Sequence, residues 1–308
     1  MFAKRSLRCL LIAALCLPAS AQAQDKGTLE PVPLPPLAKP NDPGVAAKEL
    51  FGRKAAPAPL AARALGFYAK GCLAGAVALP VNGDTWQVMR LSRNRNWGHP
   101  NLVKMIERLA EKGKKTGWNG LLVGDISQPR GGPMLTGHAS HQVGLDADIW
   151  LTPMPERELT RAEREEMSAI NMVREDRKDV DSKLWTPRHT AIIKSAAEQP
   201  EVDRIFVNAA IKKALCRDTG KNRAWLSKVR PYYGHNFHFH VRIHCPSGAE
   251  GCESQPAVPA EDGCGKELDW WFTDAVLNPK PSKVPEKPKP PIKLADLPAA
   301  CRQVLMAP

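Results

Sequence analysis

Four residues that can bind a metal or move a proton lie together in the stretch GHASHQVGLDADIWL, residues 137–151. They are His138, His141, Asp146 and Asp148. A carboxylate in a protein core is costly unless it is paired or coordinates a cation. Three imidazole or carboxylate ligands with one open position form the usual catalytic zinc site. The stretch therefore predicts a metal centre.

Two strand-like segments each place such residues on one face. Side chains alternate along a strand, so Asp146 and Asp148 share a face if residues 145–151 are extended. In HFHVRIHC, residues 238–245, the same alternation puts His238 and His240 together. A single histidine is more often an ordinary core or surface residue. The two patterns together favour a site in which a loop histidine, a strand aspartate and a distant histidine meet.

The remaining patterns indicate the elements that must position these residues. Apolar residues with helical spacing predict helices at 99–113, 190–199, 209–216 and 223–230. Short apolar runs predict further strands at 120–127 and 204–208. We therefore expect an α+β fold: a single compact domain with a small central antiparallel sheet flanked by helices and stapled by disulfides.

Composition divides the chain into four segments. Residues 1–23 have three cations followed by a short apolar run and small residues, which is typical of a secretory signal peptide cleaved near Ala23. Residues 24–61 form a proline-rich segment that we expect to be extended or mobile. Residues 62–275 are the expected compact domain, and residues 276–308 are a tail rich in proline and lysine that Cys301 would tie back to it. No segment predicts a membrane anchor.

Charge and cysteine content agree with export. The net charge of +12 falls to +9 once residues 1–23 are removed, because they carry three cations and no anion. A basic surface favours polyanions such as nucleic acid, anionic lipid or an acidic cell-wall polymer, and nucleic acid is the least expected of these for an exported protein. Six cysteines remain after residue 23, and an even number in an oxidising compartment predicts three disulfides.

Other hydrolytic and nucleotide-binding chemistries lack their motifs. The sequence contains no H-E-x-x-H, G-x-S-x-G, P-loop or G-x-G-x-x-G pattern. No serine is followed by lysine three residues later, so the S-x-x-K nucleophile of penicillin-binding proteins is absent. The histidine and aspartate patterns are therefore the only chemistry that the sequence offers.

Those patterns carry a resemblance to a known family. H-Q-V-G-L-D-A-D at 141–148, followed by H-F-H at 238–240, resembles the metal signature of the lysostaphin and D-Ala-D-Ala metallopeptidase group. Within that group the chain is similar to the penicillin-insensitive murein endopeptidases of the Gram-negative periplasm. Segments such as WGHPNLVKMIERL and RIFVNAAIKKALC also resemble this family, so the similarity covers roughly residues 65–275 and Cys301.

The resemblance implies a role for each matching residue. His141, Asp148 and His240 match the zinc ligands, and His238 matches the acid/base residue. His138 and His235 match further active-site histidines, with His138 as an additional candidate ligand. The implied reaction is hydrolysis of the D-alanyl to meso-diaminopimelyl cross-link of peptidoglycan. The implied disulfides are Cys72–Cys301, Cys216–Cys264 and Cys245–Cys252.

Two departures from the family pattern leave alternatives open. Asp146 stands where the wider group usually has alanine, so it is either a second carboxylate near the metal or a residue that orients a ligand. Some relatives have an Asp-x-x-His pair before a Leu-Trp, proposed to hold a second metal. The stretch 175–179 before Leu184-Trp185 has no histidine here, so we expect one zinc and claim no second metal. The alternative functions are a D,D-carboxypeptidase of the same group and a non-catalytic wall-binding module with a structural zinc.

Overall fold

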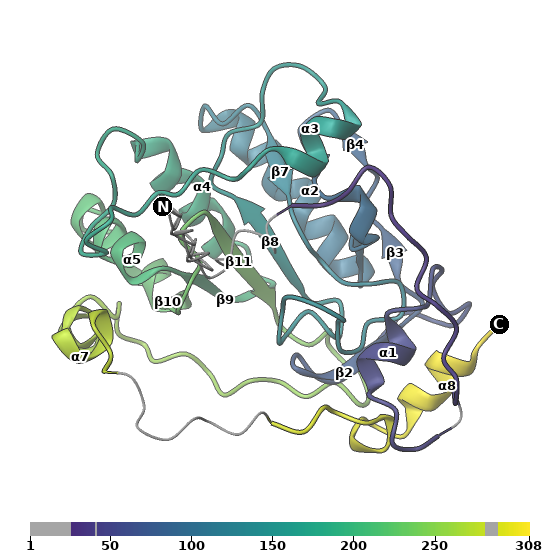
Figure 1. The fold of residues 1–308 in the computed structure, drawn as a ribbon. Coiled ribbons are helices and arrows are strands. Elements are labelled where there is room, and N and C mark those ends of the chain that lie inside the picture. Colours follow the sequence, from purple (N-terminus) through teal and green to yellow (C-terminus); the bar gives the residue numbers. More distant parts are fainter. Residues whose placement is uncertain (1–25, 41, 281–288) are drawn as a thin grey trace, which may run out of the picture.

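A seven-stranded sheet organises the residues that the computed structural model describes, which are 26–40, 42–280 and 289–308 (Figure 1). In spatial order its strands are β10 (Val229–Pro231), β9 (Val202–Val207), β11 (His238–Ile243), β8 (Asp146–Trp150), β7 (Leu121–Val123), β5 (Trp86–Val88) and β4 (Asn82–Gly83). Two smaller sheets pair β1 (Arg63–Phe67) with β2 (Lys70–Ala74) and β3 (Val77–Ala78) with β6 (Trp97–Gly98). The described residues form a single α+β domain, as the sequence predicted.

The main sheet is mixed, whereas an antiparallel sheet was expected. Its central strands β9, β11, β8 and β7 pair antiparallel, but β10 pairs parallel with β9 and β5 parallel with β7. A helix connects the strands of each parallel pair, α5 in the first and α2 in the second. Parallel neighbours need such a crossover, because a tight turn can only join antiparallel strands.

The helices follow the predicted segments closely. The α-helices are α1 (Ala47–Phe51), α2 (Pro100–Lys115), α3 (Arg161–Glu166), α4 (Pro187–Ala197), α5 (Ala209–Asp218), α6 (Lys266–Asp269), α7 (Asp274–Leu277) and α8 (Ala300–Met306). The 3-10 turns are η2 (Leu91–Arg93), η3 (Ala224–Lys228), η4 (Trp270–Phe272) and η5 (Leu294–Asp296). The segment 223–230, expected to be an α-helix, is the turn η3 followed by β10.

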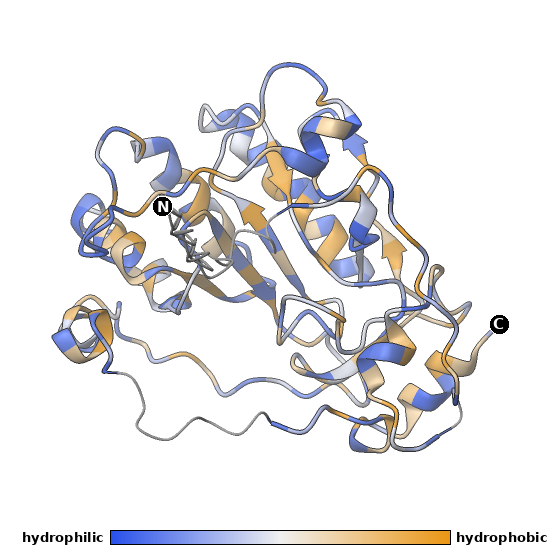
Figure 2. Cartoon of the chain, viewed as in Figure 1, coloured by the Kyte–Doolittle hydropathy of each residue, from blue (hydrophilic) through white to orange (hydrophobic). Residues whose placement is uncertain are grey.

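The sheet has an apolar face and a polar face. Ala147 and Ile149 of β8 belong to the main core, together with the buried stripe Leu102, Ile106 and Leu109 of α2. Figure 2 shows hydrophobic and hydrophilic residues in turn along the central strands. Because neighbouring residues of a strand face opposite ways, the alternate positions of β8 point to the other side of the sheet. The predicted site residues occupy that side.

The two terminal parts of the described chain form a second, smaller core with the β1–β2 hairpin. Phe51 of α1 and Val304 of α8 are buried there beside Leu65 and the Cys72–Cys301 disulfide. Residues 24–61 were expected to be extended or mobile, yet Phe51 is fully buried. The proline-rich composition did not reveal this short helix. The domain boundaries proposed from composition stay a prediction.

This second core supports the loop that precedes the predicted ligands. The Arg130 guanidinium is buried and donates to the carbonyl oxygens of Ala56, Val304, Leu305, Ala307 and Pro308 at 2.6–3.1 Å. Its backbone carbonyl accepts the N–H of a β2 residue at 3.0 Å. Gly132, with φ of +77°, lies so close to the Phe51 ring that a Cβ atom there would overlap it. One loop therefore holds both terminal segments.

The structure forms the same three disulfides that the family resemblance implied. They are Cys72–Cys301, Cys216–Cys264 and Cys245–Cys252. The first joins residues 229 positions apart, and it attaches α8 to β2. Closing so long a loop removes more entropy from the unfolded chain than closing a short one.

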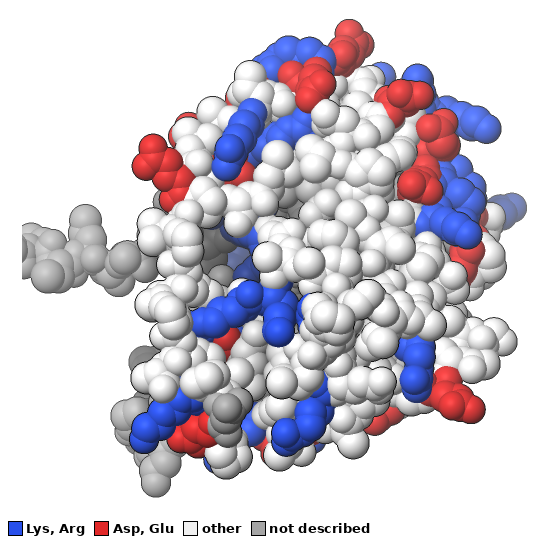
Figure 3. All heavy atoms as spheres, turned by 90° about the vertical axis from the view of Figure 1, so that its right-hand side faces the viewer, with Lys and Arg blue, Asp and Glu red and all other residues white. Residues whose placement is uncertain are grey.

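Three observations concern the predicted export of the protein. The predicted signal peptide, residues 1–23, lies outside the described residues. Among the described residues no helix is both long and apolar enough to cross a membrane. On the face shown in Figure 3, Lys and Arg side chains are interspersed with Asp and Glu. The basic excess therefore does not form one continuous patch on this face.

The Arg130 clamp generates a stability prediction. Replacing Arg130 with Met keeps much of the volume but removes the donors to five carbonyl groups, so we expect the free energy of unfolding to fall by about 2–4 kcal/mol. Hydrogen exchange in residues 300–308 should accelerate. Arg302→Met is the matched control, because Arg302 is exposed on α8 and should change stability by less than about 0.5 kcal/mol. Equal melting temperatures for both variants would contradict the clamp.

Candidate metal centre

The loop before β8 bends so that His141 lies over the strand. His141 has φ of +66° and Gly144 φ of +68°, both in the left-handed region. Only glycine fits at 144, because a Cβ atom there would meet the Leu73 side chain and the backbone of His99. The same stretch gives His141 a strained conformation that is rare for a residue with a Cβ atom. Strain of this kind is typical of functional positions.

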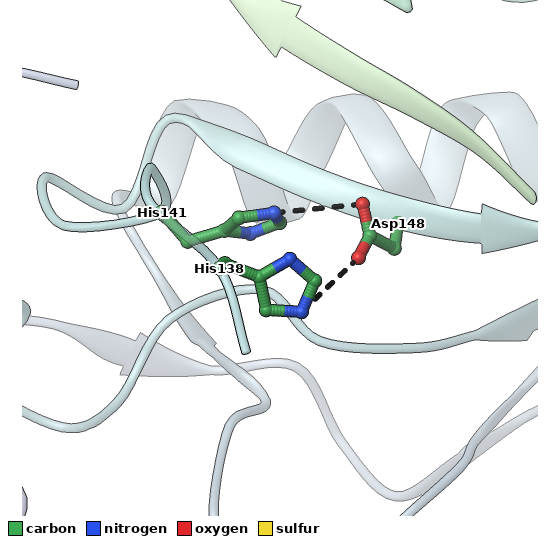
Figure 4. Close-up of side chains that lie close together, drawn as sticks. All are labelled: His138, His141 and Asp148. Atoms are coloured by element: carbon green, nitrogen blue, oxygen red, sulfur yellow. Dashed lines mark ion pairs between the residues drawn. The ribbon is translucent and has the colours of Figure 1, made fainter. Parts of the chain in front are cut away.

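The carboxylate of Asp148 lies at the centre of four imidazole rings. Its Oδ1 atom is 3.5 Å from Nε2 of His141, 3.5 Å from Nε2 of His238 and 3.2 Å from Nδ1 of His240. Its Oδ2 atom is 3.5 Å from Nε2 of His138. Figure 4 shows the His138 and His141 rings directed at the two oxygens. Burial alone would raise the pKa of Asp148, but the surrounding histidines, His238 foremost, hold it well below its usual range.

His141 is oriented from behind by the backbone. Its Nδ1 atom is 2.6 Å from the carbonyl oxygen of Ile126, an acceptor, so Nδ1 carries the proton. Nε2 then has a free lone pair. This nitrogen is buried without a hydrogen-bond partner, and so is Oδ1 of Asp148. Two buried, unpartnered acceptors 3.5 Å apart form an environment that a metal ion satisfies.

Asp146 supports the site without facing Asp148. Its carboxylate accepts two hydrogen bonds from Arg242, at 2.7 and 3.1 Å, and the backbone N–H of His141 at 3.0 Å. Its Oδ1 atom lies 3.0 Å from Nε2 of His240. Burial lowers the pKa of His240, but the attraction of Asp146 and Asp148 outweighs this and raises it overall. Asp146 thus orients one candidate ligand on each side of the site.

His138 is held by a residue that the sequence analysis did not select. Nε2 of His138 lies 3.0 Å from Oδ2 of Asp125, which also accepts hydrogen bonds from Arg95 at 2.8 Å and Arg93 at 3.1 Å. Burial alone would raise the pKa of Asp125, but His138 and these arginines hold it well below its usual range. The sequence signal that could have identified Asp125 was a carboxylate near the end of the apolar run GLLVGDIS. The predicted strand 120–127 ends at Val123, which leaves Asp125 in a loop.

His238 and His235 form the edge of the cluster. Their ring centroids are 4.9 Å apart, and the Nδ1 atom of His235 is 2.8 Å from the carbonyl oxygen of Tyr233. Burial lowers the pKa of His238 to about 4 and that of His235 to about 3. In His238 the attraction of Asp148 opposes this shift only in part. Both rings are therefore neutral near pH 7 and can accept a proton.

All the residues predicted for the site lie in this one cluster. The cross-strand pairing sets His240 opposite Asp148 and Arg242 opposite Asp146. Among the described residues, one group of three can offer ligand atoms that all lie within 4.8 Å of one another: His138, His141 and Asp148. The ligands expected from the sequence are His141, Asp148 and His240, with His138 as an additional candidate. The group contains three of these four residues, and His240 is not part of it.

Comparison with known proteins identifies the family. Residues 64–306 match the family model described as penicillin-insensitive murein endopeptidase. The chain belongs to this family. It is 48% identical over 246 residues to the penicillin-insensitive murein endopeptidase of Haemophilus influenzae, covering 79% of this chain and 82% of that protein. It is 45% and 44% identical to the proteins of the same description from Shigella sonnei and Escherichia coli K12, covering 81% of this chain and 88% of each.

A first prediction separates the two histidines of β11 in this family member. His240→Ala should lose bound metal together with activity. His238→Ala should keep close to one zinc ion per chain and a near-normal melting temperature, but lose about 100- to 10,000-fold in turnover, the usual effect of removing a general acid or base. Metal analysis and turnover are measured on the same preparations. A loaded His240→Ala with an empty His238→Ala would exchange the two roles.

A second prediction concerns Asp146 and pH. Asp146→Asn leaves the buried Arg242 charge uncompensated, so the free energy of unfolding should fall by about 3–5 kcal/mol at pH 7. The pKa of Asp146 is depressed in the folded state. Its contribution is therefore complete above the unfolded pKa of about 3.9 and is lost as the pH falls below that value. The difference between variant and wild type should accordingly shrink below pH 4.

The exposed pair Arg174–Asp176 provides the control for this measurement. Asp176→Asn should leave the free energy of unfolding nearly unchanged both at pH 7 and below pH 4, because exposed ion pairs contribute little. An Asp146→Asn variant as stable as the wild type at pH 7 would show that the buried pair does not stabilise the fold.

Proposed function

We propose that this protein is a zinc-dependent endopeptidase of the periplasm that hydrolyses the D-alanyl to meso-diaminopimelyl cross-link between peptidoglycan stem peptides. Membership of the murein endopeptidase family supports the reaction and the substrate. The single observation that supports a bound metal ion is the pair of buried, unpartnered atoms, His141 Nε2 and Asp148 Oδ1, in a cluster of imidazoles.

We assign His141, Asp148 and His240 as the ligands. His240 offers Nδ1 toward Asp148 while Nε2 faces Asp146, and a metal-bound histidine usually has its second nitrogen next to such an acceptor. In His138 the nitrogen nearest Asp148 already faces Asp125 at the shorter distance of 3.0 Å. His138 is therefore better suited to lie beside the metal as a substrate contact. The nitrogen and carboxylate donors fit zinc.

The residues around these ligands divide the chemical work. Zinc in such a site supplies Lewis-acid chemistry, which makes water nucleophilic near pH 7 and polarises a carbonyl group. His238 is neutral near that pH because burial holds its pKa at about 4. Its ring can accept a proton from the attacking water and deliver it to the leaving amine. Asp146 and Ile126 keep His240 and His141 in their orientations throughout.

The open side of the cluster is consistent with a large substrate. The His138 side chain is about one quarter exposed, whereas that of Asp148 is 7% exposed and His141 is fully buried. The candidate ligands are thus buried, whereas His138 is open to solvent. A cross-linked peptide can approach the cluster on the side of His138.

A muropeptide assay tests this function. The mature protein, loaded with zinc, should convert purified cross-linked muropeptide dimers into monomers. A strong chelator should reduce the rate by more than about 100-fold, and added zinc should restore it. β-Lactams should have no effect, because the chain has no S-x-x-K serine to acylate. His240→Ala serves as the matched inactive control.

Other products would identify the alternative functions. Release of free D-alanine from pentapeptide monomers, with dimers left intact, would indicate a D,D-carboxypeptidase. Binding of murein without any turnover would indicate a wall-binding module. Turnover that persists unchanged in the chelator would refute the metal-dependent mechanism.

A further inference from the structure

A hollow of about 330 Å³ lies beside the metal centre and is not part of it. Tyr232, Tyr233 and Trp271 line it, together with the side chains of Asn171 and Asn236. Trp271 belongs to η4, in the group of short helices that ends with α7 near the β10 edge of the sheet (Figure 1). At the small end of the range for ligand pockets, about 300–1,000 Å³, the hollow suits one ring rather than an extended polymer.

The aromatic lining is exposed to an unusual degree. Tyr232 is 54% and Tyr233 60% exposed, although packing normally covers most of such a ring. The rings of Tyr233 and Trp271 have centroids 4.8 Å apart and planes inclined at 60°, so they form a corner. A corner of two aromatic faces can pack against the C–H groups on the faces of a saturated ring.

Two amide groups beside this corner have unused hydrogen-bonding capacity. Oδ1 of Asn171 accepts two hydrogen bonds, one from Nδ2 of Asn236 at 2.8 Å and one from the backbone N–H of Val173 at 2.9 Å. Within the described residues, Nδ2 of Asn171 and Oδ1 of Asn236 have no partner. The pair therefore presents one donor and one acceptor. An acetamido group needs this combination, because it offers a carbonyl oxygen and an N–H.

A row of rings connects the hollow to the metal centre. The Tyr233 ring contacts that of Tyr232 at 6.4 Å between centroids, and Tyr232 contacts His235 at 5.6 Å. His235 in turn lies 4.9 Å from His238. Successive ring contacts thus link the hollow to His238 at the edge of the candidate metal centre.

Charge does not explain the hollow. Of its charged lining residues, Arg174 is paired with Asp176. The other two, Glu175 and Arg177, carry opposite charges. An anionic ligand would therefore find little net attraction, whereas a neutral ring with an acetamido group matches the aromatic corner and the amide pair.

We propose that this hollow is a subsite for an N-acetylated amino sugar of the glycan strand that carries the stem peptide. The inference rests on the proposed function, because it takes peptidoglycan as the substrate. The sugar ring stacks in the corner of Tyr233 and Trp271, and its acetamido group bonds Asn171 and Asn236. The subsite anchors the strand while the cross-link lies over the metal centre.

Two cross-linked dimers of the same peptide sequence, one with its disaccharides and one without, test the subsite. The wild-type protein should have a higher kcat/KM for the sugar-bearing dimer. Tyr233→Ala and Trp271→Ala should each lower that kcat/KM by about 5- to 10-fold, chiefly through KM, and leave cleavage of the sugar-free dimer within about 2-fold. Tyr233→Phe keeps the ring and should behave like the wild type.

Trp270→Ala is the matched control, because Trp270 is 53% exposed next to Trp271 but does not line the hollow. An equal loss with Trp270→Ala, or an equal loss on both dimers, would overturn the subsite. The same holds if neither Tyr233→Ala nor Trp271→Ala changes cleavage of either dimer. A wild-type protein that cleaves neither dimer would instead refute the proposed function.

Saturation-transfer NMR provides a measurement that does not depend on turnover. N,N′-diacetylchitobiose should show contact with the wild-type protein and with the inactive His240→Ala variant. Cellobiose, which lacks the acetamido groups, should show much weaker contact, and Trp271→Ala should abolish the signal of both. Equal signals from the two sugars would contradict recognition of the acetamido group.

Discussion

Placing two carboxylates on one buried face of β8 is the constraint on which the rest of this structure depends. Neither Asp146 nor Asp148 is more than 5% exposed, so each needs compensation within the protein. Asp146 obtains it from the Arg242 guanidinium, and Asp148 from the surrounding imidazoles. The first carboxylate is fully satisfied by its hydrogen bonds, while the second keeps an unpartnered oxygen. One strand therefore carries both a carboxylate that is satisfied within the protein and one that remains available as a candidate metal ligand.

The opposite face of the sheet makes this arrangement rigid. Phe239 and Val241 of β11 pack into the main core against the helices, which fixes the alternate residues that face the metal centre. The antiparallel pairing of β11 with β8 then fixes which residue of one strand lies opposite each residue of the other. A slip of one position would turn the histidines into the core and the apolar residues into the site. Core packing and site geometry are thus specified by the same alternation.

Local patterns predicted most of this arrangement. Periodicity located α2, α5 and β11 to within a few residues, and the family resemblance implied the histidines and aspartates that the fold brings together. Asp125 was missed because its role depends on where a loop closes in space, and sequence spacing does not show that. The burial of Phe51 was missed for a related reason: its partners belong to the distant residues 297–305. Contacts between remote segments leave little trace in local composition.

The Arg130 clamp ties the loop before the candidate metal centre to a segment that is distant in the sequence. The loop that includes Arg130 and leads to His138 is held by carbonyl groups of residues 304–308, which are synthesised after the loop itself. Attachment of α8 also requires oxidation of Cys72 and Cys301. A chain that has not yet reached residue 304, or whose cysteines are reduced, lacks these supports. The loop that leads to His138 is in this way linked to the synthesis of a distant segment and to the oxidation of two thiols.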